Sequence, residues 1–488
     1  MQQYNEFLGL CPIGAEVSFN NELKLNGFAL SEKFPGRLFF KVSDSTEMES
    51  NSSFSSARGA SQSETGGRKP KRRIAIKNFS RVAGDSTSAN ESTSESVGVK
   101  TNRSATEKNK IGEKAPTVDG LRYDTRANGS SRECTLVKSL MRANLKLRLT
   151  DRIGLVVAKF PCENFDDLFE GTAAVDWTDF FCEDSKIVVE KVSSSHSKLA
   201  SERAIQSVAA KAIYKRLCAA WHVNSLRETG EQFSVRVYLD NDVASVVLDT
   251  SGEPLHKRGY RQMGGIAPIR ETAAALLLQL MMWKRKMPLH DPFCGSGTIP
   301  IEAMLYAHNV APGLLREFDF QKFALFHGAE FQDMLEAEKA KAVGDIQTGN
   351  LVRITGSDID ERAVSLSLAN AENAAALTEA VMRHFGRSEK LTRPDFVQAD
   401  IAELAAPYPD GLLLGNPPYG ERLGDEAEAF AVYREIAETV REFPRWQKAF
   451  ITNKVEFPAV VREILRGQRF REHAIKYGKL ETVLYEFR

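Results

Sequence analysis

Four consecutive residues, Asn416-Pro417-Pro418-Tyr419, combine the groups that could hold a flat substrate bearing an amine. They follow the apolar residues 412–414, so a rigid loop comes directly after a predicted strand. The prolines fix φ and remove two amide donors, which leaves the Asn416 side chain and nearby carbonyls as acceptors. Tyr419 adds a stacking face. This combination suits the exocyclic amine of a nucleobase extruded from its helix. An ordinary turn is the competing interpretation of the tetrapeptide alone.

A second stretch, residues 288–303, is typical of a short strand, a glycine-rich turn and the start of a helix. Gly295 and Gly297 allow the backbone to approach a ligand closely. The turn lacks the ending of a Walker loop, and Pro300 stands where the dinucleotide fingerprint has its third glycine. The next strand-end acid, Asp358, lies about 65 residues on rather than the usual ~20. NAD is therefore the weaker interpretation.

Together the two stretches resemble the class I S-adenosylmethionine-dependent methyltransferases that modify exocyclic amines of nucleobases. The resemblance implies a turn around the methionine end of the cofactor, an acid for the ribose, an acid beside the adenine, and a loop for the target amine. The implied cofactor-binding residues are Asp291, Cys294, Gly295, Ser296, Gly297, Thr298, Asp358, Ile359 and Asp400. The implied catalytic residues are Asn416, Pro417, Pro418 and Tyr419, and no metal is expected.

The composition restricts the class of protein. A chain of 488 residues with 42% apolar residues is long enough for two to four domains with ordinary cores. Lys plus Arg equals Asp plus Glu at 65 each, so an RNA site would have to be a local basic patch. Six cysteines without paired spacing argue against zinc and against a disulfide framework. With no leader-like start and no membrane-length apolar run, we expect a soluble, cytoplasmic protein. We also expect a monomer.

The first part of the chain changes character abruptly. Residues 1–42 contain strand-like pieces with room for a helix between them, and we interpret them as a ferredoxin-like part. Residues 43–131 are dominated by Ser, Thr, Asn, Glu, Lys and Gly, and such a segment cannot bury enough surface to offset its ordering entropy. We therefore predict a disordered insertion. Its basic run, 68–73, is interpreted as a solvated linker rather than a phosphate contact.

Order is predicted to return in residues 132–255. A strand over 187–192, a helix over about 202–220, and a strand pair at 233–239 and 244–249 joined by a turn form a small α+β pattern. Placed just before a methyltransferase, this pattern resembles the THUMP module, an RNA-binding domain.

Residues 249–261 and 267–272 resemble the segment that joins THUMP to the catalytic domain in bacterial 23S rRNA guanine-N2 methyltransferases, in particular the L half of the fused K/L enzyme. The resemblance implies an α/β catalytic domain over 256–488, with a mostly parallel seven-stranded sheet and an antiparallel hairpin near 474–487. It also implies methyl transfer to the N2 of a guanosine in 23S rRNA. The second methyltransferase domain of the fused enzyme is not present in this sequence.

Alternatives remain open at this level. A tRNA guanine-N2 methyltransferase, a DNA adenine-N6 methyltransferase and a catalytically silent RNA-binding assembly factor share parts of the pattern. Cys294 is interpreted as a packing residue rather than a nucleophile, because it lies in the cofactor turn. His256 with Lys257, Arg258 and Arg261 is either a solvated connector or a functional cluster. Glu421 and Arg422 form an ion pair or are simply exposed.

Overall fold

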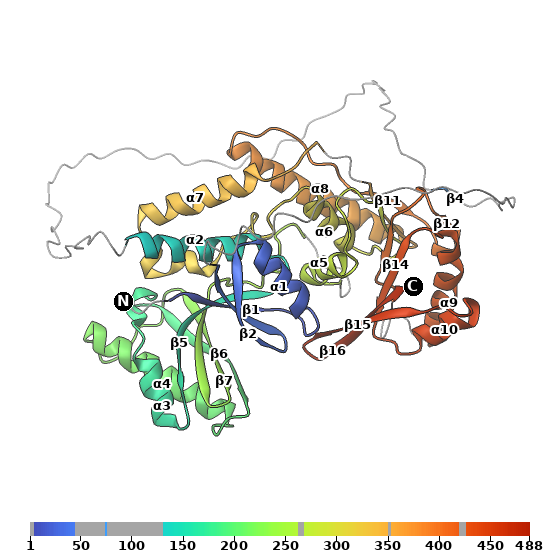
Figure 1. The fold of residues 1–488 in the computed structure, drawn as a ribbon. Helices are drawn as coiled ribbons and strands as arrows, with labels where there is room; N and C mark the ends of the chain where they lie inside the picture. Colours follow the sequence, from blue (N-terminus) through green and yellow to red (C-terminus); the bar gives the residue numbers. More distant parts are fainter. Residues whose placement is uncertain (1–3, 44–73, 76–129, 262–267, 350–352, 419–425) are drawn as a thin grey trace, which may run out of the picture. The chain divides into compact units, whose positions relative to one another are not determined.

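The computed structural model describes residues 4–43, 74–75, 130–261, 268–349, 353–418 and 426–488 (Figure 1). Two compact units divide the chain: Met1–Ile76 with Glu133–Arg488, and Lys77–Arg132. Of the second unit only residues 130–132 are described, at the start of a helix. The prediction of disorder for 43–131 thus falls almost wholly outside the described residues. Inside that range the two-residue strand β4 (Ile74–Ala75) pairs in parallel with β12 (Leu404–Ala405).

The N-terminal half of the larger unit is built on a seven-stranded mixed sheet with the order β2-β3-β1-β5-β8-β7-β6. Its strands are β1 (Glu6–Leu10), β2 (Phe28–Phe34), β3 (Arg37–Val42), β5 (Arg152–Pro161), β6 (Lys186–Ser195), β7 (Gln232–Asp240) and β8 (Val243–Asp249). The accompanying helices are α1 (Glu16–Leu25), α2 (Ser130–Lys146), α3 (Phe165–Ala173) and α4 (Glu202–Trp221). Residues on either side of the insertion share this sheet, because β1 pairs antiparallel with β5.

The predicted elements of residues 132–255 are present. The helix expected over 202–220 is α4, and its first turn is capped by the Ser201 side chain. The expected strand pair is β7 and β8, joined by Asn241 and Asp242 at φ 51° and 58°. Two residues in the left-handed region form the kind of tight turn that matches the twist of an antiparallel hairpin.

The C-terminal half is built on a second seven-stranded sheet, with the order β11-β10-β9-β13-β14-β16-β15. Its strands are β9 (Leu289–Asp291), β10 (Ile354–Asp358), β11 (Asp395–Gln398), β13 (Leu412–Gly415), β14 (Gln447–Thr452), β15 (Phe470–Tyr477) and β16 (Leu480–Phe487). The first five are parallel, and β15 and β16 form an antiparallel edge hairpin. The predicted fold class is confirmed, including the hairpin near 474–487.

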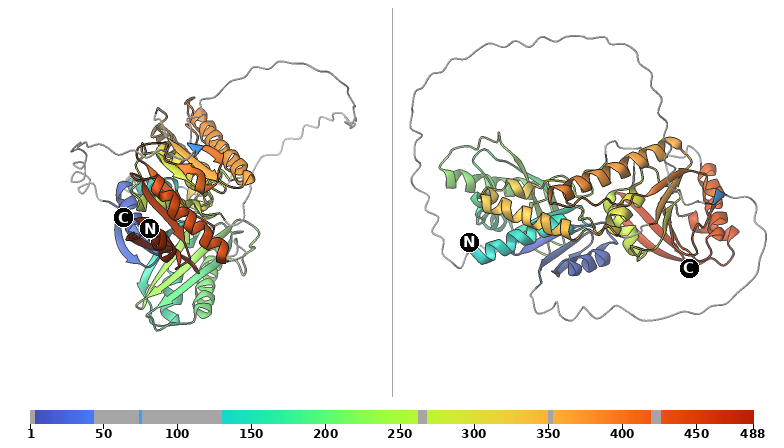
Figure 2. Two further views of the ribbon diagram at one scale, coloured as in Figure 1. Left: turned by 90° about the vertical axis from the view of Figure 1, so that its right-hand side faces the viewer. Right: turned by 90° about the horizontal axis from the view of Figure 1, so that it is seen from above.

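Helices cover both faces of this sheet (Figures 1 and 2). They are α5 (Glu271–Leu280), α6 (Thr298–Ala307), α8 (Glu361–His384), α9 (Glu426–Thr439) and α10 (Phe457–Ile464). Helix α7 (Ala329–Gly344) lies apart from this sheet, beside α2 (Figure 1). Strand β13 explains the layering: Leu412 and Leu414 join the core cluster that includes α5, α6 and α8, whereas Leu413 joins the cluster of α9 and α10. An unbroken apolar run is expected of a parallel strand buried on both faces.

Backbone contacts join the N-terminal segment to the β15–β16 hairpin. Ile13 and Lys476 form an isolated antiparallel bridge, with N–H···O distances of 3.1 and 3.0 Å. Beside it, Gly14 has a φ of 97°, and a Cβ built there would come 2.1 Å from the carbonyl oxygen of Ala474. Only glycine fits this approach without a backbone shift.

Candidate active site

The predicted site residues come together because they follow neighbouring parallel strands. Strand β9 lies between β10 and β13, and the carboxyl ends of all three meet at one edge of the sheet. In chain order, β10 and then β11 are added on one side of β9, and β13 and then β14 are added on its other side. Such a reversal leaves a crevice at the strand ends where open α/β sheets bind ligands.

The glycine-rich turn follows β9 and is held from two sides. Gly295 and Gly297 have φ values of 53° and 80°, a region that favours glycine. The Cys294 N–H donates to the Ser357 carbonyl at 2.9 Å, and the Gly295 N–H donates to Asp358 Oδ2 at 2.9 Å. A Cβ built on Gly295 would meet nothing within 4 Å, so open space lies beside the turn.

The rest of the turn starts helix α6, as the sequence predicted. Thr298 is its first residue, and Ser296 Oγ lies 3.3 Å from Thr298 Oγ1. The Cys294 side chain is buried, with its sulfur 3.6 Å from Ser367 Oγ. Burial, and then the nearby Asp291 carboxylate, raise the pKa of the Cys294 thiol well above its usual value. A neutral, enclosed thiol suits packing rather than nucleophilic attack.

The three predicted acids have different environments. Asp291 is buried, and its Oδ1 accepts the Phe293 N–H at 3.0 Å. Burial raises the pKa of Asp291 to about 8, opposed by that hydrogen bond and assisted by the charge of Asp358. Asp358 is half-buried, and Asp400 is half-buried with its Oδ1 bonded to the Ala402 N–H at 2.9 Å. Ile359, next to Asp358, is 68% exposed and could cover a flat ligand.

The loop after β13 presents an acceptor without a donor. Asn416 Oδ1 is a buried atom that meets no hydrogen-bond donor among the described residues. Pro417 is buried and Pro418 half-buried, while Tyr419 lies outside the described residues, as do Glu421 and Arg422. A Cβ on Gly415 would come 3.1 Å from the Phe293 ring, so the cofactor turn packs directly against the strand that carries Asn416.

Two residues of α8 that the sequence reasoning missed hold the turn in place. Ser367 Oγ donates to the Gly295 carbonyl at 2.7 Å, and Asn370 Nδ2 donates to the Ser296 carbonyl at 3.0 Å. Asn370 is 1% exposed, and its Oδ1 has no partner among the described residues. The sequence feature that could have identified them is a polar pair three residues apart, and thus on one face, in an alanine- and leucine-rich helix.

The basic cluster of the connector is not simply solvated. Arg258 is 2% exposed and donates to the carbonyls of Leu255 and Arg148 at 2.8 and 2.7 Å. Arg261 Nη2 reaches Thr298 Oγ1 at 3.0 Å and pairs with Glu271 at 3.0 Å. The solvated interpretation is therefore wrong for these two arginines. Arg261 connects the segment after β8 to the first residue of α6, and Arg258 lies 3.5 Å from Glu302 within the same helix.

The arrangement fits S-adenosylmethionine. Three features lie at the same edge of the sheet: a backbone turn with open space beside Gly295, the strand-end acids Asp358 and Asp400, and the Asn416 oxygen, which has no donor in the part of the chain that the structure describes. Among the described residues, no cluster of three or more His, Cys, Asp or Glu side chains could hold a metal ion. No helix in that part of the chain is long and apolar enough to cross a membrane.

Comparisons with known proteins agree with this geometry. Residues 258–484 match the RMKL-like methyltransferase domain family, and residues 162–249 match the THUMP domain family. The chain is 36% identical over 352 residues to YpsC of Bacillus subtilis, covering 72% of this chain and 85% of YpsC, whose name describes it provisionally as an RNA methyltransferase. It is 32% identical over 318 residues to the ribosomal RNA large subunit methyltransferase K/L of Shewanella baltica, covering 64% of this chain but 43% of that enzyme.

Solved structures show the same architecture. SMU.472, a methyltransferase structure complexed with SAH, matches with a TM-score of 0.67 at 25% identity, covering 100% of this chain and 98% of that one. A structure from Listeria monocytogenes, named as an N6-adenine-specific DNA methylase, matches with a TM-score of 0.69 at 26% identity, covering 99% and 96%. This chain belongs to the RMKL-like family of S-adenosylmethionine-dependent methyltransferases and carries a THUMP domain before its catalytic domain.

Proposed function

We propose that this protein transfers the methyl group of S-adenosylmethionine to the exocyclic N2 of a guanosine in large-subunit rRNA. The observation that carries the proposal is the Asn416 carboxamide oxygen, a buried acceptor with no donor among the described residues. An acceptor held in this way costs free energy unless a ligand donates to it. An amine N–H of a flipped base is the donor that this position suits.

When bound, the cofactor supplies an electrophilic methyl group on a sulfonium with a good leaving group. The residues of the chain therefore act mainly by positioning. Asn416 Oδ1 and the Pro417 carbonyl accept the two amine N–H groups, which directs the nitrogen lone pair at the methyl carbon. The N–C bond forms as the C–S bond breaks, and the extra proton on nitrogen then leaves to solvent. Tyr419 is proposed to stack on the base, and Asp358 and Asp400 to hold the ribose and adenine.

The choice of RNA rests on the THUMP match at residues 162–249. The choice of guanine-N2 in large-subunit rRNA rests on the likeness to the K/L enzymes and on the connector sequence. An adenine-N6 activity is the second candidate, since the Listeria neighbour carries that name and the acceptor loop suits either amine.

Mass mapping of modified nucleosides from a deletion strain tests the proposal. We expect one N2-methylguanosine to disappear from 23S rRNA and to return when the wild-type gene is expressed. Loss from tRNA instead would reassign the substrate, and loss of N6-methyladenine from DNA would favour the second candidate. Transfer to no RNA or DNA, in vivo or with purified protein, would show that the chain is an RNA-binding factor without catalysis.

A further inference from the structure

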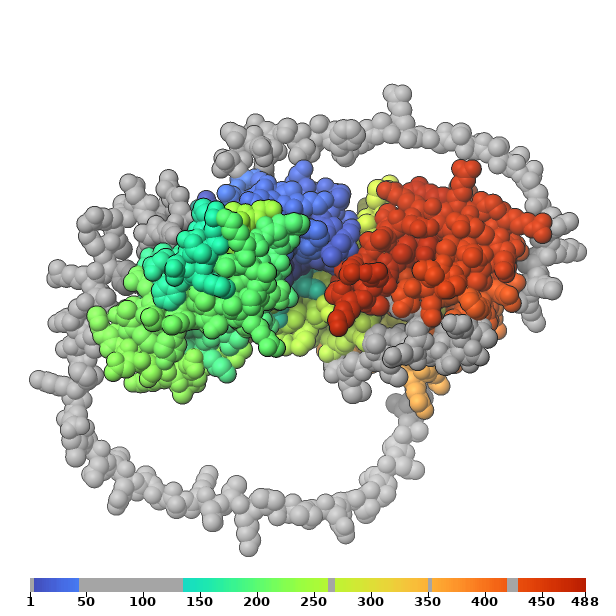
Figure 3. All heavy atoms as spheres, turned by 90° about the horizontal axis from the view of Figure 1, so that it is seen from below, coloured from blue at the N-terminus to red at the C-terminus, as the bar shows by residue number. Residues whose placement is uncertain are grey.

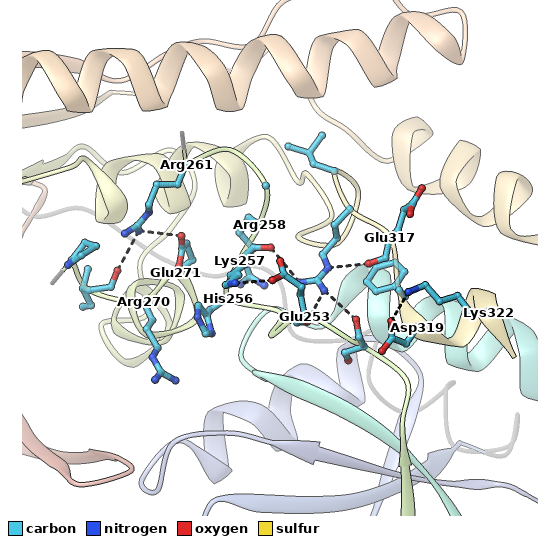
Figure 4. Close-up of a pocket in the computed structure, with 17 residues that line it drawn as sticks. Glu253, His256, Lys257, Arg258, Arg261, Arg270, Glu271, Glu317, Asp319 and Lys322 are labelled. Atoms are coloured by element: carbon cyan, nitrogen blue, oxygen red, sulfur yellow. Dashed lines mark hydrogen bonds and ion pairs between the residues drawn. The ribbon is translucent and has the colours of Figure 1, made fainter. Parts of the chain in front are cut away.

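A cavity of about 810 Å³ lies along the segment that follows β8, but the charges in its wall are already paired. Figure 3 shows one face of the molecule hollowed between N-terminal elements in blue and green and C-terminal elements in red. In Figure 4, Arg261 pairs with Glu271 at one end of the cavity and Lys322 with Asp319 at the other, at 3.0 and 3.4 Å. The other lysines and arginines of the wall, apart from Arg316, also have carboxylate partners. The wall therefore has no excess of positive charge to attract an anion.

A buried polar contact in the catalytic sheet lies closer to the cofactor turn. His290 of β9 is fully buried, and each of its ring nitrogens lies beside a hydroxyl group of β10. Nδ1 is 2.8 Å from Thr355 Oγ1, and Nε2 is 3.1 Å from Ser357 Oγ. Thr355 and Ser357 are two residues apart on one strand, so their side chains lie on the same face of the sheet. His290 thus bridges two neighbouring strands with both ring nitrogens.

The Thr355 hydroxyl determines which nitrogen carries the proton. Thr355 Oγ1 donates to the Leu289 carbonyl at 3.2 Å, and a hydroxyl group has only one proton to donate. Nδ1–H must therefore donate to Thr355, which leaves Nε2 unprotonated as the acceptor for the Ser357 hydroxyl. Burial lowers the pKa of His290 to about 3, so the ring is neutral at physiological pH and keeps this arrangement.

The contact with Ser357 lies where the ladder between the two strands ends. The pairing of β9 with β10 stops at Asp291 and Gly356, so the next two residues of β10, Ser357 and Asp358, extend beyond it. On its opposite side, β10 stays paired with β11 as far as Asp358. The strand end that carries Asp358 is therefore held by a ladder on one side and by individual hydrogen bonds on the other.

These individual hydrogen bonds come from two places. The N–H groups of Cys294 and Gly295, in the cofactor turn, donate to the Ser357 carbonyl and to Asp358 Oδ2, each at 2.9 Å. His290 instead belongs to the strand before the turn, and it accepts from the Ser357 side chain. Its contact ties the end of β10 to a rigid element of the sheet, whatever the turn does.

We propose that His290 is a positioning residue: through Ser357 it sets where Asp358 lies relative to the cofactor turn, and so aligns the ribose of S-adenosylmethionine with its methionine end. The inference rests on the roles that the proposed function gives to the turn and to Asp358. His290 acts through Ser357 and Asp358, without a contact of its own to the cofactor. Its effect should therefore appear for a ligand that spans both parts of the site, whereas a histidine that only fills the core would affect every ligand alike.

The test compares two amides at position 290. In His290→Gln the amide oxygen can take the place of Nε2 and accept from Ser357, whereas the shorter side chain of His290→Asn reaches Thr355 but not Ser357. His384→Asn, at an exposed position of α8, is the control. Calorimetry measures the affinity for S-adenosylhomocysteine and for 5′-methylthioadenosine, which keeps the ribose but lacks the amino-acid part. Tm is recorded for every variant.

His290→Asn should bind S-adenosylhomocysteine about threefold to tenfold more weakly, the effect of one hydrogen bond, with less than about a twofold change for 5′-methylthioadenosine. His290→Gln and the control should bind both ligands as the wild type does. Ser357→Ala should show the same loss as His290→Asn. The double variant should lose no more than either single variant, because all three lack the same contact.

Equal losses for the two ligands in His290→Asn, or equal affinities of His290→Asn and His290→Gln for S-adenosylhomocysteine, would overturn the proposal and leave His290 as a core residue. If the position-290 variants do not fold, Ser357→Ala decides: a loss confined to S-adenosylhomocysteine supports the proposal, and any other result overturns it. Asp358→Ala with wild-type affinity for 5′-methylthioadenosine would overturn the ribose assignment and this inference with it. None of these measurements needs RNA, so failure to methylate any RNA would refute the proposed function and leave the result for His290 unchanged.

Discussion

The cofactor turn and Asn416 differ in whether their polar atoms have hydrogen-bond partners among the described residues. The turn is held by hydrogen bonds with Ser357, Asp358, Ser367 and Asn370, whereas the Asn416 side-chain oxygen has no donor among the described residues. The turn is thus complete before the base arrives. We propose that the target amine supplies the donor for the Asn416 oxygen, as expected of a group used mainly at the barrier.

Substitution of Asn416 tests this difference. Asn416→Ala should lower single-turnover methyl transfer by about 10²-fold or more, because the amine loses its orienting acceptor, while cofactor affinity stays close to that of the wild type. Asn21→Ala, an exposed position on α1, is the control. Turnover of Asn416→Ala equal to that of Asn21→Ala would refute the assigned role.

Asp291 predicts a specific dependence of stability on pH. Its pKa is raised from 3.8 to about 8, mainly by burial, so the folded protein keeps a proton that the unfolded chain loses. The contribution is fully present below pH ~4 and is lost as the pH rises through about 8. Asp291→Asn should therefore flatten this part of the Tm profile between about pH 4 and pH 8, as measured by scanning calorimetry of the cofactor-free protein. An exposed-acid control, Asp410→Asn, should keep the wild-type profile; an unchanged slope in Asp291→Asn would contradict the argument.

At the scale of elements, the strand, turn and helix of residues 289–307 were predictable because their signals are local. An apolar run, glycines at the turn and a helix-compatible sequence follow one another within a few residues. The role of α8 was not predictable, because Ser367 and Asn370 act on carbonyls more than 70 positions away in the chain. The burial of Arg258 was missed for the same reason: beside the local Leu255 carbonyl, its partners are the Arg148 carbonyl and the Glu302 carboxylate, which only the fold brings near.

Helix α8 should contribute to cofactor affinity through the turn it supports. Ser367→Ala removes the bond to the Gly295 carbonyl, which is worth about 0.5–1.5 kcal/mol, and should weaken cofactor binding by roughly twofold to tenfold. Ser365→Ala lies on the exposed side of the same helix and should have no effect. Cofactor affinity is measured by calorimetry on both variants. Identical affinities would show that the turn keeps its geometry without the Ser367 hydrogen bond.

At the scale of the whole molecule, a buried ionic network links the N-terminal sheet to the catalytic domain. The Glu22 carboxylate accepts the backbone N–H groups of Arg148 and Leu149, and Arg148 pairs with Glu302 of α6 at 3.2 Å. Arg258 Nε lies 3.5 Å from the same Glu302. Burial raises the pKa of the Glu22 carboxyl group, and the positive charges of Arg148 and Arg258 partly offset this rise. Burial lowers the pKa of the Arg148 guanidinium, and the negative charges of Glu302 and Glu22 partly offset this fall.

Removing one member of this network should be costly. Arg258→Met leaves part of the Glu302 charge uncompensated in the interior and should lower the free energy of unfolding by about 3–5 kcal/mol. Hydrogen exchange should show faster opening in both halves of the unit, because the network joins Glu22 of α1 to Glu302 of α6. Arg383→Met, at an exposed position of α8, is the control. An effect confined to one sheet would show that the two halves are not coupled here.

The insertion is predicted to be dispensable for catalysis, since its composition cannot form a core and a long loop costs little more entropy than a short one. Joining Val42 to Ser131 through a short Gly/Ser linker should leave Tm and methyl transfer unchanged. A second deletion that keeps residues 68–76 isolates any contribution of β4. Loss of activity in a well-folded first deletion, restored by the second, would assign the insertion a structural role.

The contact between Arg261 and Thr298 offers a physical route by which the binding of RNA and the binding of the cofactor can affect each other. Arg261 belongs to the segment that follows β8, and Thr298 begins the helix that follows the cofactor turn. Two ligands that bias the same contact must affect each other equally: whatever factor the cofactor adds to RNA affinity, RNA adds to cofactor affinity. If the spent and the fresh cofactor bias this contact differently, RNA affinity must differ between the two complexes by the same factor.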